Sequence, residues 1–455
     1  MNIEQVYVYH QKKDNIGYEF IDAECCHLIE FAVDVVKPGD KVVIKPNFVR
    51  QCSIESKEWI HVITNPNLIK VVLKAVVNKL NNNGEVIILD APQEDSDFNQ
   101  IVKNIGLEQI VKEIQKDTKV PISFVDIRIE RKKTINGIIV KRIQQAGDPK
   151  GYKKVNLASD SCFDKKNNKD YYGADYDRKA ARGYHNNLEN SYVISGTVLD
   201  CDVFINMPKW KTHKIGGMTC CLKNAVGIIG VKNCIPHHTL GCPENGGDAY
   251  PKITGKVNTE SQLKQLAHFL LNKNIPFIGY FVAVGKYIFA PFLGKPMQTI
   301  RSGHWYGNDT LWRAILDLNK IVFYADKNGK MRETQQRKYV AIIDGIVAGE
   351  KNGPLMPDSK DCGVVAITKS PLLGDTVMAT LMGFDYRNIP CIREGYKINK
   401  YRLNSNINLE ELIISSNEKK WNKKLSELKN NDVFHFEPAF GWKGHVELKE
   451  YIRRD

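Results

Sequence analysis

The strongest constraint on the fold of this chain is an alternation of strand and helix signals between residues 41 and 90. The apolar run at 41–45 predicts a buried strand, and apolar residues over 67–82 recur at the spacing of a helix that begins at Pro66. Residues 85–89 predict the next strand. Two strands joined by a helix usually pair in parallel in one sheet. We therefore expect an α/β fold, with a mostly parallel sheet, helices on both faces and long insertions.

The same signals continue along the rest of the chain. They predict strands at 6–9, 120–126, 135–143, 338–343 and 362–368, and helices at 100–117, 259–272 and 371–382. We expect residues 1–400 to form one α/β core and residues 401–455 to form a C-terminal helical and charged segment. Loss of periodicity and clusters of polar residues predict three insertions in this core, at about 147–190, 232–258 and 273–307.

The composition is that of a soluble globular protein, with 42% hydrophobic and 26% charged residues. A formal charge of +13 favours anionic partners. Because the charge is spread along the chain without an arginine-rich tail, nucleic acid is not the expected partner. The eleven cysteines are odd in number and irregularly spaced, so we expect reduced thiols in the cytoplasm. The N-terminal residues also lack the apolar segment of a secretion signal.

Residues 203–230 combine several side chains that are common in anion-binding sites. An apolar strand at 203–205 is followed by lysines, a histidine and the Gly216-Gly217 turn, and residues 219–229 predict a helix. A strand that delivers cations to a glycine turn at a helix N-terminus is typical of anion sites in α/β proteins. The alternative is a solvated basic loop. The predicted anion ligands are Lys45, Asn47, Lys209, Lys211, Gly216, Gly217, Lys223 and Asn224.

Three residues are candidates for catalysis. His213 lies in the same stretch, and the ordinary pKa of histidine suits an acid–base role near neutral pH. Asp344 and Asp375 are predicted near a strand end and a helix start, where they could orient groups or hold a divalent ion. A simpler interpretation of Asp375 is that it stabilises the helix N-terminus.

An aromatic loop contains Trp305, which we predict to stack on a bound sugar or nucleobase. The alternative is that its aromatic side chains anchor this loop in the core.

A separate loop contains Cys234, His237, His238 and Cys242 within nine residues. The spacing is compatible with a zinc or iron site, although it matches no standard zinc signature. The alternative is a polar loop without a metal. A metal site here would favour a non-catalytic metal- or ligand-binding protein.

Residues 275–294 are the most apolar twenty residues of the chain. Gly285, Lys286 and two prolines argue against a membrane-spanning helix. Three alternatives remain for this segment: a buried hairpin, a contact between the subunits of a homo-oligomer, and a contact with a membrane surface.

Six segments carry a family resemblance: VVIKPNF at 42–48, ITNPNLIKVVLKAV at 63–76, VIILDA at 86–91, residues 200–227, IIDGIVAGEKNGP at 342–354 and SPLLGDTVMATLMG at 370–383. They resemble the domain of unknown function 362 family. Many members of that family carry ferredoxin-type cysteine repeats, but this chain has no CxxCxxC run, so no iron–sulfur cluster of that kind is expected. The GNDTLWR and GWKGH segments are similar to a subgroup associated with surface-polysaccharide biosynthesis.

His213 and Lys223 also stand ten residues apart on either side of Gly216-Gly217. This spacing is similar to that of the nickel-dependent lactate racemase family, in which the lysine carries a nickel-pincer nucleotide. The other metal-binding positions of that family have no match in this chain, so the resemblance does not extend to the cofactor.

These observations predict an enzyme that acts on a small anionic or phosphorylated substrate, with surface-polysaccharide biosynthesis as its setting. The alternatives are a non-catalytic metal- or ligand-binding protein and a membrane-surface scaffold. The sequence has no GxGxxG after a strand, no GxxxxGK[ST], no GxSxG and no HExxH, so it predicts no reaction class. The sequence identifies no cofactor, and a divalent metal is the one candidate that its residues suggest.

Overall fold

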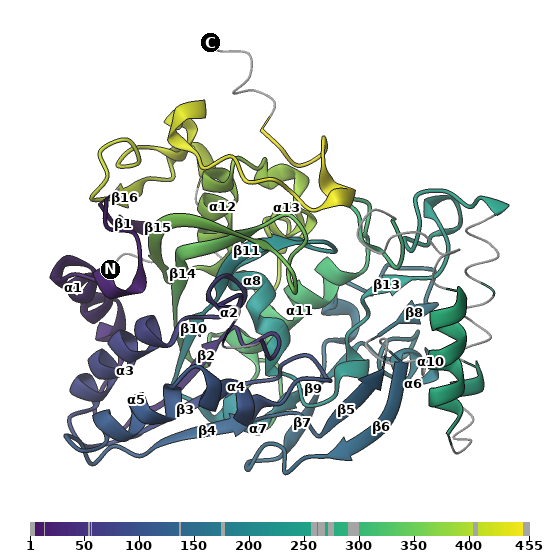
Figure 1. Cartoon of the computed structure of the whole chain (residues 1–455), viewed down its shortest axis with the longest axis horizontal. Coiled ribbons are helices and arrows are strands. Elements are labelled where there is room, and N and C mark those ends of the chain that lie inside the picture. Colours follow the sequence, from purple (N-terminus) through teal and green to yellow (C-terminus); the bar gives the residue numbers. More distant parts are fainter. Residues whose placement is uncertain are drawn as a thin grey trace.

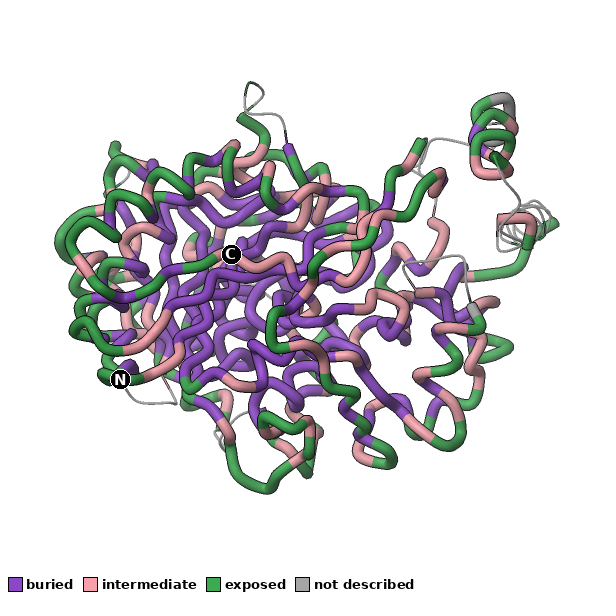
Figure 2. The backbone as a smooth tube through the Cα atoms, turned by 90° about the horizontal axis from the view of Figure 1, so that it is seen from below, coloured by how far each residue is buried: buried purple, intermediate pink, exposed green. Residues whose placement is uncertain are grey.

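The computed structural model describes residues 5–12, 14–52, 55, 57–135, 138–173, 178–255, 262, 269–271, 277–289, 300–403 and 408–448. One large sheet crosses the molecule, and the buried residues are concentrated in the middle of the molecule (Figure 2). Along this sheet the strands follow the order β16 (Ile414–Ser416), β1 (Val6–His10), β15 (Asp358–Thr368), β14 (Lys338–Glu350), β10 (Val203–Met207), β2 (Lys41–Pro46), β3 (Glu85–Asp90) and β4 (Ile122–Asp126).

The centre of this sheet is parallel. β4, β3, β2, β10 and β14 pair in parallel in that order, whereas β15 is antiparallel to both of its neighbours, β14 and β1. The predicted strands of the core lie in this sheet, except the strand at 135–143, and the predicted α/β fold is confirmed. β15 lies between β14 and β1, and the strand–helix–strand pattern did not predict its antiparallel direction.

Helices cover both faces of the sheet (Figure 1). Val42 and Ile44 of β2 pack in one core, and Val43 between them packs in the other. Successive side chains of a strand point to opposite faces, so one buried strand supplies both cores. The first core includes α1 (Ala23–Ala32), α3 (Pro66–Leu80), α4 (Phe98–Asn104) and α5 (Leu107–Ile114), and the second includes α11 (Leu311–Tyr324), α12 (Pro371–Met382) and α13 (Pro390–Gly395).

The predicted helices agree with the structure to different degrees. The helices at 67–82 and 371–382 are found as α3 and α12. The single helix predicted at 100–117 is two helices, because Gly106 between α4 and α5 has a φ of +72°, which a right-handed helix cannot continue. The helix predicted at 259–272 lies largely outside the described residues.

Three two-stranded sheets lie beside the main sheet, on the right of Figure 1. The predicted insertion at 147–190 therefore contains regular structure, including α6 (Arg178–Tyr184). The predicted strand at 135–143 corresponds to one arm of a hairpin. The three pairs are β5 (Glu130–Ile135) with β6 (Ile138–Gln144), β7 (Tyr152–Asn156) with β9 (Ser191–Ser195), and β8 (Tyr171–Tyr172) with β13 (His238–Thr239).

The apolar segment at 275–294 forms a helix in its described part, α10 (Ile278–Phe289), which packs against β6 at the right of Figure 1. Ala283 is buried, but Phe281 and Tyr287 are 72% and 73% exposed. The buried-hairpin interpretation of this segment is therefore wrong for residues 277–289. Among the described residues, no helix is both long enough and apolar enough to cross a membrane.

The C-terminal segment is not the helical segment that we predicted. Its described part consists of short 3-10 turns and β16, which pairs with β1. Trp421 and Trp442 are buried, and the Trp442 Nε1–H donates to the Lys214 carbonyl at 3.0 Å. Gly217 has a φ of +80°, and a Cβ atom at this position would lie 3.1 Å from the Trp442 ring. The C-terminal segment thus packs directly on the turn that contains Gly217.

Trp442→Ala is expected to lower the free energy of unfolding by about 3–5 kcal/mol, because it removes a buried indole and leaves the Lys214 carbonyl without this donor. Urea unfolding followed by circular dichroism measures the change. Phe440→Ala is the matched control, since Phe440 lies in the same 3-10 turn but is exposed, and it should change stability by less than about 0.5 kcal/mol. Equal effects of the two substitutions would contradict the docking of this segment through Trp442.

Candidate functional site: a lysine-lined cavity

A cavity of about 340 Å³ lies at the carboxyl ends of β2 and β3, next to the stretch at 203–230. This is the edge of a parallel sheet at which α/β proteins bind ligands. Four lysines and two carboxylates line it, together with two histidines and smaller polar groups. These lining residues are Lys45, Asn47, Asp90, Glu94, His213, Lys214, Thr219, Lys223, Asn224, Gly227, Lys232 and His237.

A buried ion pair lies at the ends of the two strands. The Lys45 Nζ atom lies 2.8 Å from Asp90 Oδ1, and both side chains are almost fully buried. Asp90 also accepts the backbone N–H groups of Phe48 and Ala91, at 2.7 Å each. The Asn224 amide joins this group, because its Oδ1 accepts from Asn47 Nδ2 at 3.0 Å and its Nδ2 donates to the Lys45 carbonyl at 3.1 Å. The structure therefore brings Lys45, Asn47 and Asn224 together, and their role as anion ligands stays a prediction.

Gly227 allows this pair to reach the cavity. A Cβ atom at this position would lie 2.3 Å from Asp90 Oδ1 and 2.7 Å from Lys45 Nζ. No real Cβ atom tolerates such distances, so a larger residue would displace the ion pair. The sequence analysis did not select Gly227, because its need for space comes from strands that are distant along the chain.

Lys223 is carried by a short helix, α8 (Cys221–Asn224), and not by the longer helix predicted at 219–229. After α8 the chain continues as a 3-10 turn, Ala225–Ile228. Asp375 accepts the first backbone N–H groups of α8, from Cys221 at 2.7 Å and Leu222 at 3.2 Å. These N–H groups are therefore not available to an anion, and the predicted anion site at this helix N-terminus does not form.

Asp375 thus orients α8, whereas the simpler interpretation made from the sequence concerned the N-terminus of its own helix, which Ser370 caps. Burial raises its pKa to about 7. Asp375 does not line the cavity, so it is not placed to transfer a proton to a ligand there.

Lys223 and Lys232 give the cavity its positive charge. Burial, followed by the charges of Lys232 and Lys45, lowers the pKa of Lys223 to about 8. Burial also lowers the pKa of Lys232 to about 8, against the attraction of Asp90. The Lys232 amine donates to the Ala91 carbonyl at 2.6 Å. Among the described residues, no carboxylate or carbonyl oxygen contacts the amine of Lys223, so its charge remains for a ligand.

His213 lines the cavity as a neutral donor. Its Nδ1 accepts the backbone N–H groups of Ile215 at 3.1 Å and Gly216 at 3.0 Å, which assigns the proton to Nε2. Burial and the charge of Lys223 hold its pKa well below 6.5. The ordinary histidine pKa, on which we based the acid–base role, therefore does not apply, and the role itself stays a prediction. Gly216 uses its N–H group in this contact.

The turn at Gly216-Gly217 is also placed differently from the prediction. It joins two short strands, β11 (Lys209–His213) and β12 (Gly217–Thr219), and does not lead directly into a helix. Neither glycine lines the cavity. Their predicted role as anion ligands is replaced by a role in shaping the hairpin that carries His213 and Thr219.

Two buried polar atoms beside the cavity lack a hydrogen-bond partner among the described residues: Thr219 Oγ1 and Asn47 Oδ1. Thr219 is 2% exposed. Buried polar atoms are rarely left unpaired in folded proteins, because the loss of hydration costs free energy. Both residues line the cavity, so a bound ligand would supply the missing partners.

Lys209, Lys211 and Asp344 lie outside the cavity, in contrast to the prediction. The Lys209 amine lies 3.1 Å from Asp344 Oδ2 and donates to the Tyr18 hydroxyl at 2.6 Å. Asp344 also accepts the backbone N–H of Asn65 at 2.8 Å. The Lys211 amine donates to the carbonyls of Val62 and Pro354. All three predicted site residues are fully buried with their polar groups paired, so their role is structural.

Trp305 also lies away from the cavity. Its side chain is buried, and its Nε1–H donates to the Asp248 carbonyl at 2.8 Å. The alternative made from the sequence, a loop anchored in the core by its aromatic residues, describes Trp305 correctly, and a stacking role at this cavity is excluded for it.

The predicted Cys/His metal site does not form, because the four side chains point to different surroundings. Cys234 Sγ donates to the Val231 carbonyl at 2.9 Å, His238 stacks on Tyr172, and Cys242 Sγ lies 3.4 Å from Glu244. His237 alone reaches the cavity.

Among the described residues, three ligand atoms within 4.8 Å of one another are found only at Cys220, Cys221 and Asp375. Burial raises the pKa of both thiols, and Asp375 is already engaged by α8, so this group does not offer the deprotonated thiolates that a metal needs.

His237 has the opposite tautomer to His213. Its Nδ1 lies 3.0 Å from the Ile235 carbonyl, which assigns a proton to Nδ1 and a lone pair to Nε2. Burial and the charge of Lys223 lower its pKa to about 4. The cavity therefore has one neutral imidazole that donates and one that accepts.

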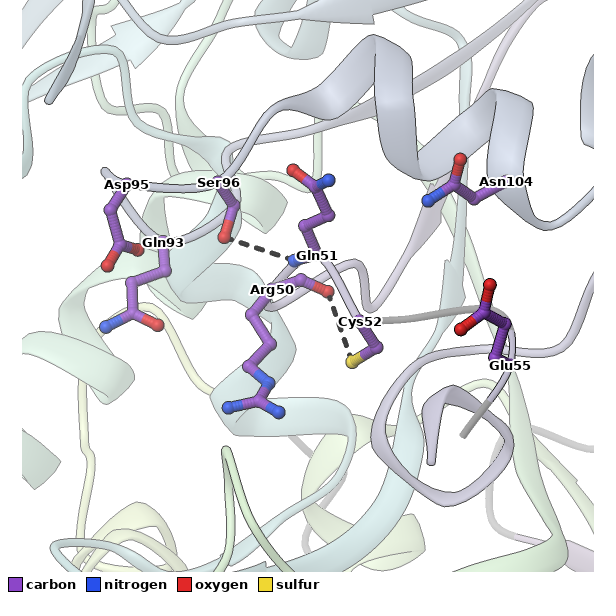
Figure 3. A pocket seen from close by; sticks show the side chains of 8 residues that line it. All are labelled: Arg50, Gln51, Cys52, Glu55, Gln93, Asp95, Ser96 and Asn104. Carbon is purple, nitrogen blue, oxygen red and sulfur yellow. Dashed lines mark hydrogen bonds between the residues drawn. The ribbon is translucent and has the colours of Figure 1, made fainter. Parts of the chain in front are cut away.

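A second, larger hollow of about 630 Å³ lies next to the cavity, and Gln93 lines both. In Figure 3 Asn104 and Glu55 lie on one side of it, and Asp95, Ser96 and Gln93 lie on the other. Arg50 is the one cation that lines it, whereas Glu55 and Asp95 are both acidic. Its charge does not favour an anion, so we place the candidate site in the smaller cavity.

The fold and the cavity define an α/β protein with a cationic site at the carboxyl ends of its parallel strands. The chain belongs to the family Domain of unknown function (DUF362), whose model matches residues 42–147 and 150–380. No curated protein matches the sequence. A crystal structure of a Thermotoga maritima protein is similar with a TM-score of 0.33 and 11% identity, over 77% of this chain and 55% of that chain. This chain thus spans little more than half of the length of that protein.

Lys223→Met is expected to stabilise the protein at pH 7. The amine has a pKa of about 8 in the folded state and 10.5 as an ordinary lysine. Below pH 8 it is charged in both states, and the folded state carries the cost of holding this charge in a partly buried place without a partner. Between these two values the unfolded chain binds more protons, so the stability of the wild type rises with pH relative to the variant.

Urea unfolding at pH 7 and pH 10 measures this difference. The variant should have the higher midpoint at pH 7, and the gap should shrink at pH 10. Lys397→Met, at an exposed lysine, should show no such change with pH. A variant less stable than the wild type at pH 7 would contradict the burial of an unpaired charge.

Proposed function

We propose that the protein is an enzyme that binds a small anionic or phosphorylated substrate in the lysine-lined cavity. The observation that carries this proposal is the amine of Lys223, which faces the cavity without an acceptor among the described residues. Lys223 is partly buried. Charges that have lost part of their hydration are normally paired in proteins, and an anionic ligand would supply that partner.

The other polar groups of the cavity support an anion. Thr219 Oγ1 and His213 Nε2 each have a hydrogen to donate, and Lys232 adds a second cation. Both carboxylates are compensated, Asp90 by Lys45 and Glu94 by Lys132. Donors that surround a compact space suit the oxygens of a phosphate group.

The size of the cavity favours a metabolite. About 340 Å³ is within the range of small-molecule sites, which is roughly 300–1,000 Å³. A phosphorylated sugar is the substrate class that we favour, because the GNDTLWR and GWKGH segments resemble a subgroup associated with surface-polysaccharide biosynthesis. In this proposal the donors hold the phosphate and Asn47 binds a hydroxyl group through Oδ1.

Lys223→Met is expected to weaken the binding of inorganic phosphate roughly tenfold or more at pH 7, because a charge-assisted hydrogen bond is lost. Isothermal titration calorimetry measures the affinity. His213→Asn should also weaken binding, since the shorter amide can still accept the turn N–H groups but lacks the Nε2–H donor. Sulfate, whose charge is constant over this range, should bind less tightly above pH 8, where Lys223 and Lys232 lose their protons.

Lys397→Met serves as the surface control and should bind phosphate like the wild type. The proposal fails if folded Lys223→Met and His213→Asn proteins bind phosphate with unchanged affinity, or if the wild type binds none.

A second candidate function comes from α10. Its exposed side chains Phe281, Val284 and Tyr287, with Phe277 before the helix, follow one another at helical spacing on one face. The hairpin on which α10 packs exposes Lys133 and Lys141. An apolar aromatic face beside lysines is typical of segments that lie on anionic membranes. We propose contact with an anionic lipid surface through this face.

Phe281→Glu combined with Tyr287→Glu is expected to lower co-sedimentation with phosphatidylserine vesicles roughly tenfold, because two apolar side chains no longer enter the lipid. Phe440→Glu, at an exposed aromatic residue elsewhere, is the control and should sediment like the wild type. If the wild-type protein does not co-sediment with vesicles but forms dimers in sedimentation velocity, the face of α10 is instead a contact between two copies of the chain.

A further inference from the structure

The lysines around the candidate site differ in what their amines contact. Lys45, Lys209, Lys211 and Lys232 all donate to carboxylate, hydroxyl or carbonyl oxygens. Among the described residues, Lys223 and Lys214 have no such acceptor, and both line the same cavity. Of the two, Lys223 is the one acted on by neighbouring cations, Lys232 and Lys45. Lys232 shows that a lysine can give the cavity positive charge while its amine is hydrogen-bonded. The lack of an acceptor at Lys223 is therefore not needed for charge alone.

The environment of Lys223 also makes its amine a nucleophile. With a pKa of about 8, about a tenth of it is neutral at pH 7, far more than for an ordinary lysine. Burial and a neighbouring cation are the two features that activate lysines for attack on carbonyl carbon. The cavity has no carboxylate without a lysine partner, since Asp90 and Glu94 are both paired, so an amine is its best nucleophile.

We propose that Lys223 forms an imine with the carbonyl group of a phosphorylated aldehyde or ketone bound in this cavity. This inference rests on the proposed function, because the anion site positions the substrate. The charged amine of Lys223 contacts inorganic phosphate. When a phosphorylated carbonyl compound is bound, Thr219 and His213 hold its phosphate group, and the neutral amine of Lys223 attacks the carbonyl carbon.

The reaction is a condensation that needs no oxidant or reductant. The lone pair of Lys223 Nζ forms a bond to the carbonyl carbon while the C=O π bond breaks, and the oxygen takes up a proton. The nitrogen loses one proton, which gives a neutral carbinolamine. The hydroxyl group then takes up a second proton and leaves as water while the nitrogen lone pair forms the C=N bond, and the nitrogen loses its second proton to give the neutral imine. The two hydrogens of the amine and the oxygen of the carbonyl thus leave together as one water molecule.

Two neighbours are suited to these proton transfers. Lys232 is the strongest neighbouring charge acting on Lys223, and its ammonium group can donate a proton to the leaving oxygen. His237 presents an Nε2 lone pair to the cavity and is itself most affected, after burial, by the charge of Lys223. It can accept the proton that the nitrogen loses.

The test uses pyridoxal 5′-phosphate, which is a phosphorylated aldehyde whose imines are coloured. The full-length protein is incubated with it at pH 8 and treated with sodium borohydride, and peptide mass spectrometry locates the reduced adduct. We expect one dominant adduct on Lys223, suppressed at least tenfold by excess inorganic phosphate and absent from folded Lys223→Met protein. The rate should rise with pH up to about 8 and then level off, because the neutral amine reacts. Pyridoxal, without the phosphate group, should react at least tenfold more slowly.

Lys397→Met is the control, because Lys397 is an exposed lysine outside the cavity, and this variant should keep the adduct on Lys223. An adduct that lies on Lys214, or that is spread over surface lysines and persists in Lys223→Met, overturns the proposal. Phosphate binding without any adduct at Lys223 overturns the imine and leaves the anion site in place. Wild-type protein that neither binds phosphate nor forms the adduct overturns the proposed function itself.

Discussion

The site depends on one ion pair, between Lys45 at the end of β2 and Asp90 at the end of β3. The two strands are parallel neighbours, so their carboxyl ends lie at the same edge of the sheet. Asp90 holds the chain after both strands by accepting the N–H groups of Phe48 and Ala91, and Asn224 ties α8 to the backbone of Lys45. Removal of either charge would leave the other buried without a partner. Such a change is strongly destabilising and lowers the free energy of unfolding. The pair therefore positions the cavity without being free to act on a ligand.

Burial divides the lysines of this chain into two groups. Lys209 and Lys211 belong to the same stretch as Lys223 and have the same chemistry in isolation. Lys209 compensates Asp344 inside the molecule, and Lys211 satisfies two backbone carbonyls, so both hold β11 in place. Lys223 and Lys232 lie on segments that face the cavity, and their positive charges repel each other. Partners, and not residue type, decide which lysine is available to a ligand.

The fold could be predicted from the sequence because periodicity is local: α3 and the strands on either side of it are visible in fifty residues. Part of the site was predictable for the same reason, since Lys45 ends a strand and His213 and Lys223 flank a glycine turn. The rest depends on contacts across the chain. Whether Asp375 caps α8, whether Gly227 must lack a side chain, and whether Thr219 finds a partner are decided by segments far away in sequence. The Cys/His loop shows the converse, because neighbours in sequence can point in different directions.

The pairing of β1 with β16 has a consequence for how the chain is made. Val6 pairs with Ile414, so β1 is synthesised long before the segment that covers its outer edge. The Gly217 turn likewise waits for Trp442. Contacts between such distant segments are slow to form, and an uncovered strand edge can pair with other chains in the meantime. During synthesis there is therefore a period in which most strands of the sheet have been made, but β16 does not yet cover β1 and Trp442 does not yet cover the Gly217 turn.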